Sequence, residues 1–248
     1  MLRAVTSRRA ATFAPARAFA TVSERAFPNE GESEVKTGFP SPSTLAYKEE
    51  AGASTCTLNV HFPIDLKQSV GNYAVDGDGN KLLDVFTSIG TNAVGYNHPR
   101  MLDACGEELM QMALATRTGV GINPLKEFVD INQKAFLDVA PTGMTRVTGA
   151  MCGTCAVEGA YKVAMITYAQ RKRGGMTVPP TQLELDSCML NQAPGSPNYA
   201  ILSLKQGFHG RLLGALSSSR TKAMHKVDIP AFDWPAAQNP VYKYPLEE

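Results

Sequence analysis

The residues whose types and spacing best suit chemistry lie in the run Cys152-Gly153-Thr154-Cys155. We expect a strand to end just before this turn and a helix to begin in it, so that free backbone N–H groups and the helix dipole favour an anion such as phosphate. Gly153 would let the backbone approach the anion, and the Thr154 hydroxyl could donate to a phosphate oxygen. A simple helix cap by Thr154 explains the same residues without a ligand.

The two cysteines of this run suggest a second kind of chemistry. Thiolates three residues apart, as Cys152 and Cys155 are, can share a soft metal. One such pair supplies only half of a four-sulfur site, so the other half would come from a symmetry-related copy. The alternative is a pair of small buried residues at the start of a helix.

A second candidate site follows the apolar strand predicted over residues 199–204. Ligands of open α/β sheets bind where strands end, and Phe208, His209 and Arg211 follow this strand. The Phe208 ring could stack on a planar cofactor, and the Arg211 fork could bind a carboxylate at two points. The alternatives are core filling for Phe208, a surface ion pair for Arg211 and a structural role for His209.

The elements that must position these residues form a strand, helix and strand in sequence order. The pattern predicts a strand over 146–148 and a helix over 155–169 that ends near the basic and glycine residues 171–175. The segment 177–198 holds several prolines and predicts a surface excursion. A strand over 199–204 and a short helix follow. This order is typical of an α/β fold with a parallel sheet covered on both faces.

The N-terminal half shows weaker patterns. Residues 24–60 are polar and rich in Pro, Gly, Glu and Ser, which predicts an extended arm, with regular structure beginning after it. Strands over 72–75 and 81–86 would flank the tight turn 76–80, Asp-Gly-Asp-Gly-Asn. The turn is not a calcium loop, because Lys81 takes the sixth position, where such a loop needs Gly.

Two helices are expected further on. Pro99 suits the first turn of a helix over 100–112, and Pro124 begins a second helix that runs to Phe136. The glycines of 119–121 lack the third glycine and the preceding strand of a dinucleotide-binding loop, so we exclude that motif.

Composition limits the possible partners. The 248 residues carry a net charge of +1 and 44% hydrophobic side chains, which is typical of a globular protein without a field that favours nucleic acid or an anionic membrane. No apolar run approaches the roughly 18 to 20 residues that span a bilayer. Small molecules and proteins are therefore the expected partners.

The first 23 residues have the composition of a mitochondrial presequence, with arginines among Ala, Ser, Thr and Phe and no acidic residue before Glu24. A disordered basic arm is the alternative. A mitochondrial matrix protein resides in a reducing compartment, so the five cysteines do not indicate a disulfide framework.

Several segments together resemble the mitochondrial γ-aminobutyrate aminotransferases. They are residues 75–99, the CGTC turn, the GFHGR loop at 207–211 and residues 225–248 with Phe-Asp-Trp-Pro. GFHGR marks ω-aminotransferases in general, whereas CxxC together with FDWP is more specific to the γ-aminobutyrate members.

The resemblance implies a fold-type-I, pyridoxal-phosphate-dependent α/β enzyme that works as a homodimer and exchanges an amino group between 4-aminobutyrate and 2-oxoglutarate. Another ω-amino acid, β-alanine or ornithine, is the alternative substrate, because a carboxylate-binding arginine does not measure chain length. The residues implied are Gly153 and Thr154 for the cofactor phosphate, Phe208 for its ring, Arg211 and Ile89 for substrate, and Cys152 and Cys155 for a [2Fe–2S] cluster shared between subunits.

The resemblance also implies a division of the chain: a presequence over 1–23, an N-terminal arm and small-domain segment over 24–100, and the first part of a truncated large domain over 101–248. After the second cysteine, Val157 stands where the family usually has a polar residue, and Gly159 weakens the helix by about 0.5 to 1 kcal/mol relative to Ala.

The family's pyridine-nitrogen aspartate and cofactor-linking lysine match no motif in these 248 residues, so we expect this chain to be inactive alone. The alternative is a non-catalytic half-fold that serves as a binding or structural component of a mitochondrial assembly.

Overall fold

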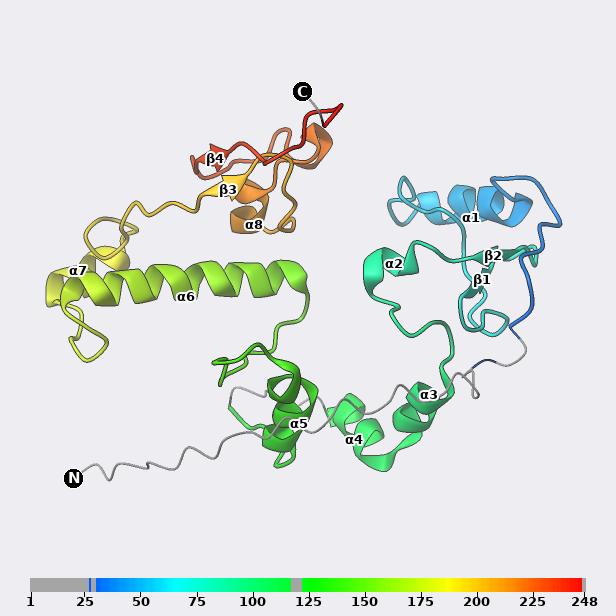
Figure 1. Cartoon of the computed structure of the whole chain (residues 1–248), viewed down its shortest axis with the longest axis horizontal. Coiled ribbons are helices and arrows are strands. Elements are labelled where there is room, and N and C mark those ends of the chain that lie inside the picture. Colours follow the sequence, from blue (N-terminus) through cyan, green and yellow to red (C-terminus); the bar gives the residue numbers. More distant parts are fainter. Residues whose placement is uncertain (1–26, 28–29, 117–121, 247–248) are drawn as a thin grey trace. The chain divides into compact units, whose positions relative to one another are not determined.

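The structure is a computed structural model that describes residues 27, 30–116 and 122–246 (Figure 1). It divides into two compact units, Met1–Leu125 and Lys126–Glu248. The predicted presequence and the glycines of 119–121 lie outside the described residues.

The first unit contains a helix where the sequence predicts an arm without regular structure. Helix α1 spans Pro42–Gly52, so that expectation is wrong. Its apolar residues do not form one stripe along the helix, so the sequence of this segment shows no helical period. A long-range contact supports its start instead, since the Ser43 N–H donates to Asp78 Oδ2 at 2.8 Å.

The predicted pair of strands is confirmed, although the second is shorter than expected. Strands β1 (Tyr73–Val75) and β2 (Lys81–Leu83) pair antiparallel. The turn between them closes on the buried Asp76 carboxylate, which accepts hydrogen bonds from the N–H groups of Asp78 and Asn80 at 3.0 and 2.9 Å. Asn80 Oδ1 in turn accepts from the backbone of Lys36 at 2.6 Å, so this turn anchors the preceding segment.

The helix predicted over 100–112 is two helices, because the backbone of Glu107 is extended and interrupts it. The remaining helices of the first unit are α2 (Thr87–Gly90), α3 (Pro99–Gly106) and α4 (Glu108–Thr116).

In the second unit the long helix is confirmed. Helix α6 spans Gly153–Arg173, two residues earlier and four residues later than the predicted limits of 155–169. It ends at Gly174, whose φ of 112° lies in the left-handed region that favours glycine.

Two other expectations for this unit are wrong. Residues 146–148 form no strand, because the paired strands among the described residues are β1 with β2 and β3 with β4, which leaves this stretch without a neighbour. The proline-rich segment 177–198 contains helix α7 (Gln182–Cys188), which begins at a capping box formed by Thr181 and Glu184.

The predicted strand over 199–204 is reduced to β3 (Ser203–Leu204), which pairs parallel with β4 (Ala236–Ala237). Helix α8 (Leu213–Ser218) lies over the first half of α6 (Figure 1). Their contact includes Trp234, whose ring packs edge-on against Tyr161 with centroids 5.7 Å apart.

Smaller elements are α5 (Phe128–Ala135), which begins four residues after Pro124, and the single turns η1 (Leu137–Val139) and η2 (Ala223–His225). No described helix combines the length and apolarity needed to cross a membrane.

Candidate functional site

The first turn of α6 presents an open helix start. Cys152 is its N-cap, with extended backbone, and its side chain makes no capping hydrogen bond. Thr154 therefore lies inside the helix, and the interpretation of Thr154 as the capping residue is wrong. A Cβ added to Gly153 would meet no atom within 4 Å, so space is available beside these N–H groups. A helix of 21 residues brings the positive end of its dipole to this point.

The GFHGR loop lies directly against this turn. Gly210 has a φ of 121°, and a Cβ at this position would overlap the Thr154 hydroxyl, so both the backbone conformation and the close approach require glycine. The Leu212 N–H donates to Thr154 Oγ1 at 3.3 Å. Because the hydroxyl accepts this bond, its own hydrogen is available to donate to another acceptor.

Glu158, four residues after Thr154 on α6, fixes the rest of the loop. Its Oε1 accepts from the N–H groups of Gly214 and Ala215 at 2.8 and 3.2 Å, which lie in the first turn of α8. Glu158 belongs to no motif that marks a functional residue, although its spacing of four from Thr154 places it on the same helix face.

Phe208 and Arg211 project from this loop and meet a third residue, His225. The Phe208 ring is 53% exposed, which excludes core filling in the described structure, and its centroid lies 6.0 Å from that of His225 in an edge-on contact. Arg211 is exposed and its Nη2 lies 3.2 Å from His225 Nε2. Arg211 forms no ion pair with a carboxylate of the described residues.

His209 has a different role from Phe208 and Arg211. Its N–H donates to Ser219 Oγ at 2.8 Å, which ties the loop to the end of α8. Its Nε2 is buried and has no hydrogen-bond partner among the described residues. The backbone contact supports the structural role expected for His209.

The two cysteines lie close together at the start of α6. Their Sγ atoms are 3.3 Å apart, with Cys152 exposed and Cys155 half-buried. The backbone N–H of Cys155 lowers the pKa of the Cys152 thiol, and the hydrogen bond with Cys152 raises the pKa of Cys155. The described residues hold no group of three or more His, Cys, Asp or Glu side chains that could bind a metal.

Ile89 belongs to the first unit. It is 83% exposed, and its φ of 60° is unusual for a β-branched residue. The turn that carries it is held by Asp84, whose Oδ1 accepts from the N–H of Thr87 at 2.7 Å and whose Oδ2 accepts from the Tyr96 hydroxyl at 2.7 Å. Such strain is often found at functional sites.

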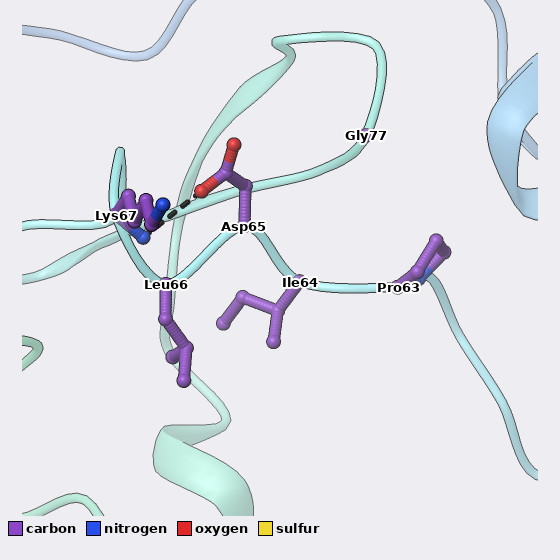
Figure 2. A pocket seen from close by; sticks show the side chains of 6 residues that line it. All are labelled: Pro63, Ile64, Asp65, Leu66, Lys67 and Gly77. Carbon is purple, nitrogen blue, oxygen red and sulfur yellow. Dashed lines mark hydrogen bonds between the residues drawn. The ribbon is translucent and has the colours of Figure 1, made fainter.

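Hollows of two sizes occur among the described residues of the same unit. The larger, of about 1130 Å³, includes Phe86, Ser88 and Tyr96 and so borders the turn that carries Ile89. Figure 2 shows the smaller one, of about 460 Å³, where the Lys67 N–H donates to Asp65 Oδ1. No residue predicted to have a functional role lines the smaller hollow.

The structure thus brings Gly153, Thr154, Phe208 and Arg211 together on one unit, at the start of a helix that follows a glycine turn. With this geometry, and with residues 56–248 matching the family model for class-III aminotransferases, the chain belongs to that family. Its fold is that of the fold-type-I aminotransferases, at partial length.

Among similar proteins, the 4-aminobutyrate aminotransferase of Dictyostelium discoideum is 46% identical over 223 residues, which are 90% of this chain and 45% of that protein. The human mitochondrial 4-aminobutyrate aminotransferase is 40% identical over 214 residues, 86% of this chain and 42% of that one. The structure of a lysine aminotransferase from M. tuberculosis matches with a TM-score of 0.59 and 26% identity, over 82% of this chain and 43% of that chain. The chain therefore spans slightly less than half the length of these relatives.

Proposed function

We propose that this chain is the N-terminal portion of a pyridoxal-phosphate-dependent 4-aminobutyrate aminotransferase, which transfers the amino group of 4-aminobutyrate to 2-oxoglutarate and forms succinate semialdehyde and glutamate. The observation that carries the proposal is the Thr154 hydroxyl, which accepts from the Leu212 N–H and keeps a hydrogen for a phosphate oxygen at the start of α6. The relatives named 4-aminobutyrate aminotransferase support the choice of substrate.

Each site residue would do one task. The N–H of Gly153, at the first position of α6, and the Thr154 hydroxyl would bind the cofactor phosphate, and the exposed Phe208 would pack on the cofactor ring. Arg211 would bind the substrate carboxylate, and Ile89 would line the substrate pocket. When bound, pyridoxal phosphate supplies an electron-withdrawing ring that carries the amino group between the two substrates.

The surroundings of the enzyme are also part of the proposal. We propose a mitochondrial matrix protein, on the basis of the arginine-rich first 23 residues and of relatives named as mitochondrial. In the complete homodimer, residues 24–100 would form the arm and small-domain segment and residues 101–248 the first part of the large domain.

Phosphate recognition is tested by titrating the chain with pyridoxal phosphate and, separately, with pyridoxal. Thr154→Val is expected to weaken binding of pyridoxal phosphate by about 10- to 150-fold, because a hydrogen bond to a charged group contributes about 1.5 to 3 kcal/mol. It should leave the weaker binding of pyridoxal unchanged. Thr154→Ser keeps the hydroxyl and is the matched control. Equal affinity of Thr154→Val and the wild type for pyridoxal phosphate would refute the phosphate site and favour a non-catalytic binding role.

Cys152 and Cys155 fit half of a [2Fe–2S] site, because their sulfurs are adjacent and one is exposed. We propose that the same pair of the partner subunit completes it. Anaerobic reconstitution with iron and sulfide should give a visible absorption band and a dimer, both abolished by Cys152→Ser. Cys188→Ser, at a half-buried cysteine outside this turn, is the control. A wild-type chain that takes up no iron would contradict the cluster.

A further inference from the structure

We propose that His225 is a positioning residue for Arg211: its imidazole accepts a hydrogen bond from the guanidinium and holds the remaining N–H donors of the fork toward a substrate carboxylate. This inference rests on the proposed function, in which Arg211 binds that carboxylate. It adds a residue to which the sequence patterns gave no role, because His225 lies 14 residues beyond Arg211 and outside the GFHGR motif.

The contact fixes which atom donates. An arginine stays protonated in proteins and has only donors, so at 3.2 Å the Arg211 Nη2 donates and His225 Nε2 accepts. The imidazole is then neutral and carries its hydrogen on Nδ1, which is buried without a hydrogen-bond partner among the described residues. Arg211 keeps the second hydrogen of Nη2, which can pair with the Nε hydrogen or with an Nη1 hydrogen in a two-point bond to a carboxylate.

The same imidazole also touches the other residue of the proposed site. Its ring meets Phe208 edge-on, with centroids 6.0 Å apart and an interplanar angle of 67°. A single side chain therefore contacts both the residue expected to pack on the cofactor ring and the residue expected to bind the carboxylate.

The backbone of His225 is well placed to hold a fixed position. The residue ends the turn η2, and the next residue, Lys226, donates from Nζ to the carbonyl oxygens of Leu216 and Ser219, the latter at 2.9 Å. These carbonyls belong to the buried end of α8 and the residue after it. His225 is thus anchored to the helix that Glu158 connects to α6.

The surroundings of His225 favour its neutral form. Burial lowers its pKa first, and the positive charges of Arg211 and Lys222 lower it further. Lys226 is the other cation nearby, and its ammonium group is directed at α8. Protonation would place a positive imidazole against the guanidinium, so the acceptor is lost only when the pH falls below the depressed pKa of His225. Loss of the acceptor frees the fork, and carboxylate affinity should fall.

The test measures binding of glutarate, a dicarboxylate without an amino group, to the chain by calorimetry. His225→Leu removes the acceptor and should weaken binding about tenfold, in line with a hydrogen bond to a charged group. His225→Gln keeps an acceptor and does not titrate, so it should bind within about twofold of the wild type. On acidification from pH 8 to pH 5.5, affinity should fall in the wild type more than in His225→Gln.

A second readout is independent of ligand. The pKa of His225, followed by NMR, should rise in Arg211→Gln, because the like charge beside the ring is removed. An unchanged pKa would show that the two groups are not in contact and would overturn the inference.

These experiments distinguish the positioning role of His225 from the carboxylate-binding role of Arg211. If Arg211→Gln abolishes glutarate binding but His225→Leu does not weaken it, Arg211 binds the carboxylate and the positioning role falls. If neither variant changes binding, or the wild type does not bind, both proposals fall. An affinity that rises on acidification would make His225 a direct cationic contact, which also overturns the positioning role.

Discussion

At the scale of single residues, the site depends on one close approach between the loop and the helix. Gly210 allows the loop backbone to lie against Thr154, and the Leu212 N–H then donates a hydrogen bond to the Thr154 hydroxyl oxygen. The orientation of the Thr154 hydrogen toward a ligand is therefore a consequence of a glycine in another element. The loop sequence and the helix start act as one unit even though they are more than fifty residues apart.

Replacing this glycine should damage both stability and cofactor binding. Gly210→Ala introduces a Cβ that overlaps Thr154 and places a side chain at a φ of 121°, so we expect the free energy of unfolding to fall by about 1 to 3 kcal/mol. Urea denaturation measures the loss, and pyridoxal phosphate titration should show weaker binding. Gly149→Ala is the control, because a Cβ there meets no atom within 4 Å and φ is not left-handed. If the two variants were equally stable, the close approach would not exist in solution.

At the scale of elements, α7 depends on an ionised side chain. Glu184 accepts from the Thr181 N–H at 2.7 Å and its Oε1 lies 3.3 Å from Arg173 Nη2, so it both caps α7 and joins it to the end of α6. The hydrogen bonds from Thr181, and then the charge of Arg173, lower the pKa of Glu184 below 4.5. Because the folded-state pKa is depressed, the stabilisation is complete above the unfolded pKa and is lost as the pH falls through the folded value.

The cap is tested with Thr181→Ala, which should reduce stability by about 1 kcal/mol at pH 7. The difference from the wild type should shrink as the pH is lowered from 5 to 3, because Glu184 becomes protonated in both proteins. Thr177→Ala, at a threonine with no side-chain hydrogen bond among the described residues, should show no such difference. A cost of Thr181→Ala that did not depend on pH would mean that the hydrogen bond from the Thr181 hydroxyl to the carboxylate contributes nothing to stability.

The elements that the sequence predicted correctly carry strong local signals. Helix α6 follows a glycine turn and has a basic, glycine-ended terminus, and the β1–β2 hairpin has its own glycine turn. Helix α7 was missed because prolines around it suggested a loop, although Thr181 and Glu184 have the spacing of a capping box. The false strand at 146–148 and the role of His225 depend on distant neighbours, which no local pattern records.

At the scale of the whole molecule, each unit buries few apolar side chains. The buried hydrophobic residues among those described are Ala74 and Val75 in the first unit and Ala215, Leu216 and Trp234 in the second. Helix α6 meanwhile exposes Val163 and Ile166, at 64% and 56%, on one face. Contiguous apolar surface of this kind is typical of a face that another chain segment or subunit covers.

A polypeptide of residues 1–248 should therefore bind a dye that fluoresces on apolar surfaces and should self-associate in sedimentation experiments. Val163→Glu places a charge on the exposed face of α6, so it should reduce both dye fluorescence and the size of the associated species. Lys162→Glu, at the adjacent exposed position, changes the charge by a larger amount but removes no apolar side chain, so it should leave dye binding unchanged. If the two variants reduced association equally, net charge rather than the apolar face of α6 would drive it. If the wild type bound no dye, this face would already be covered within the chain itself.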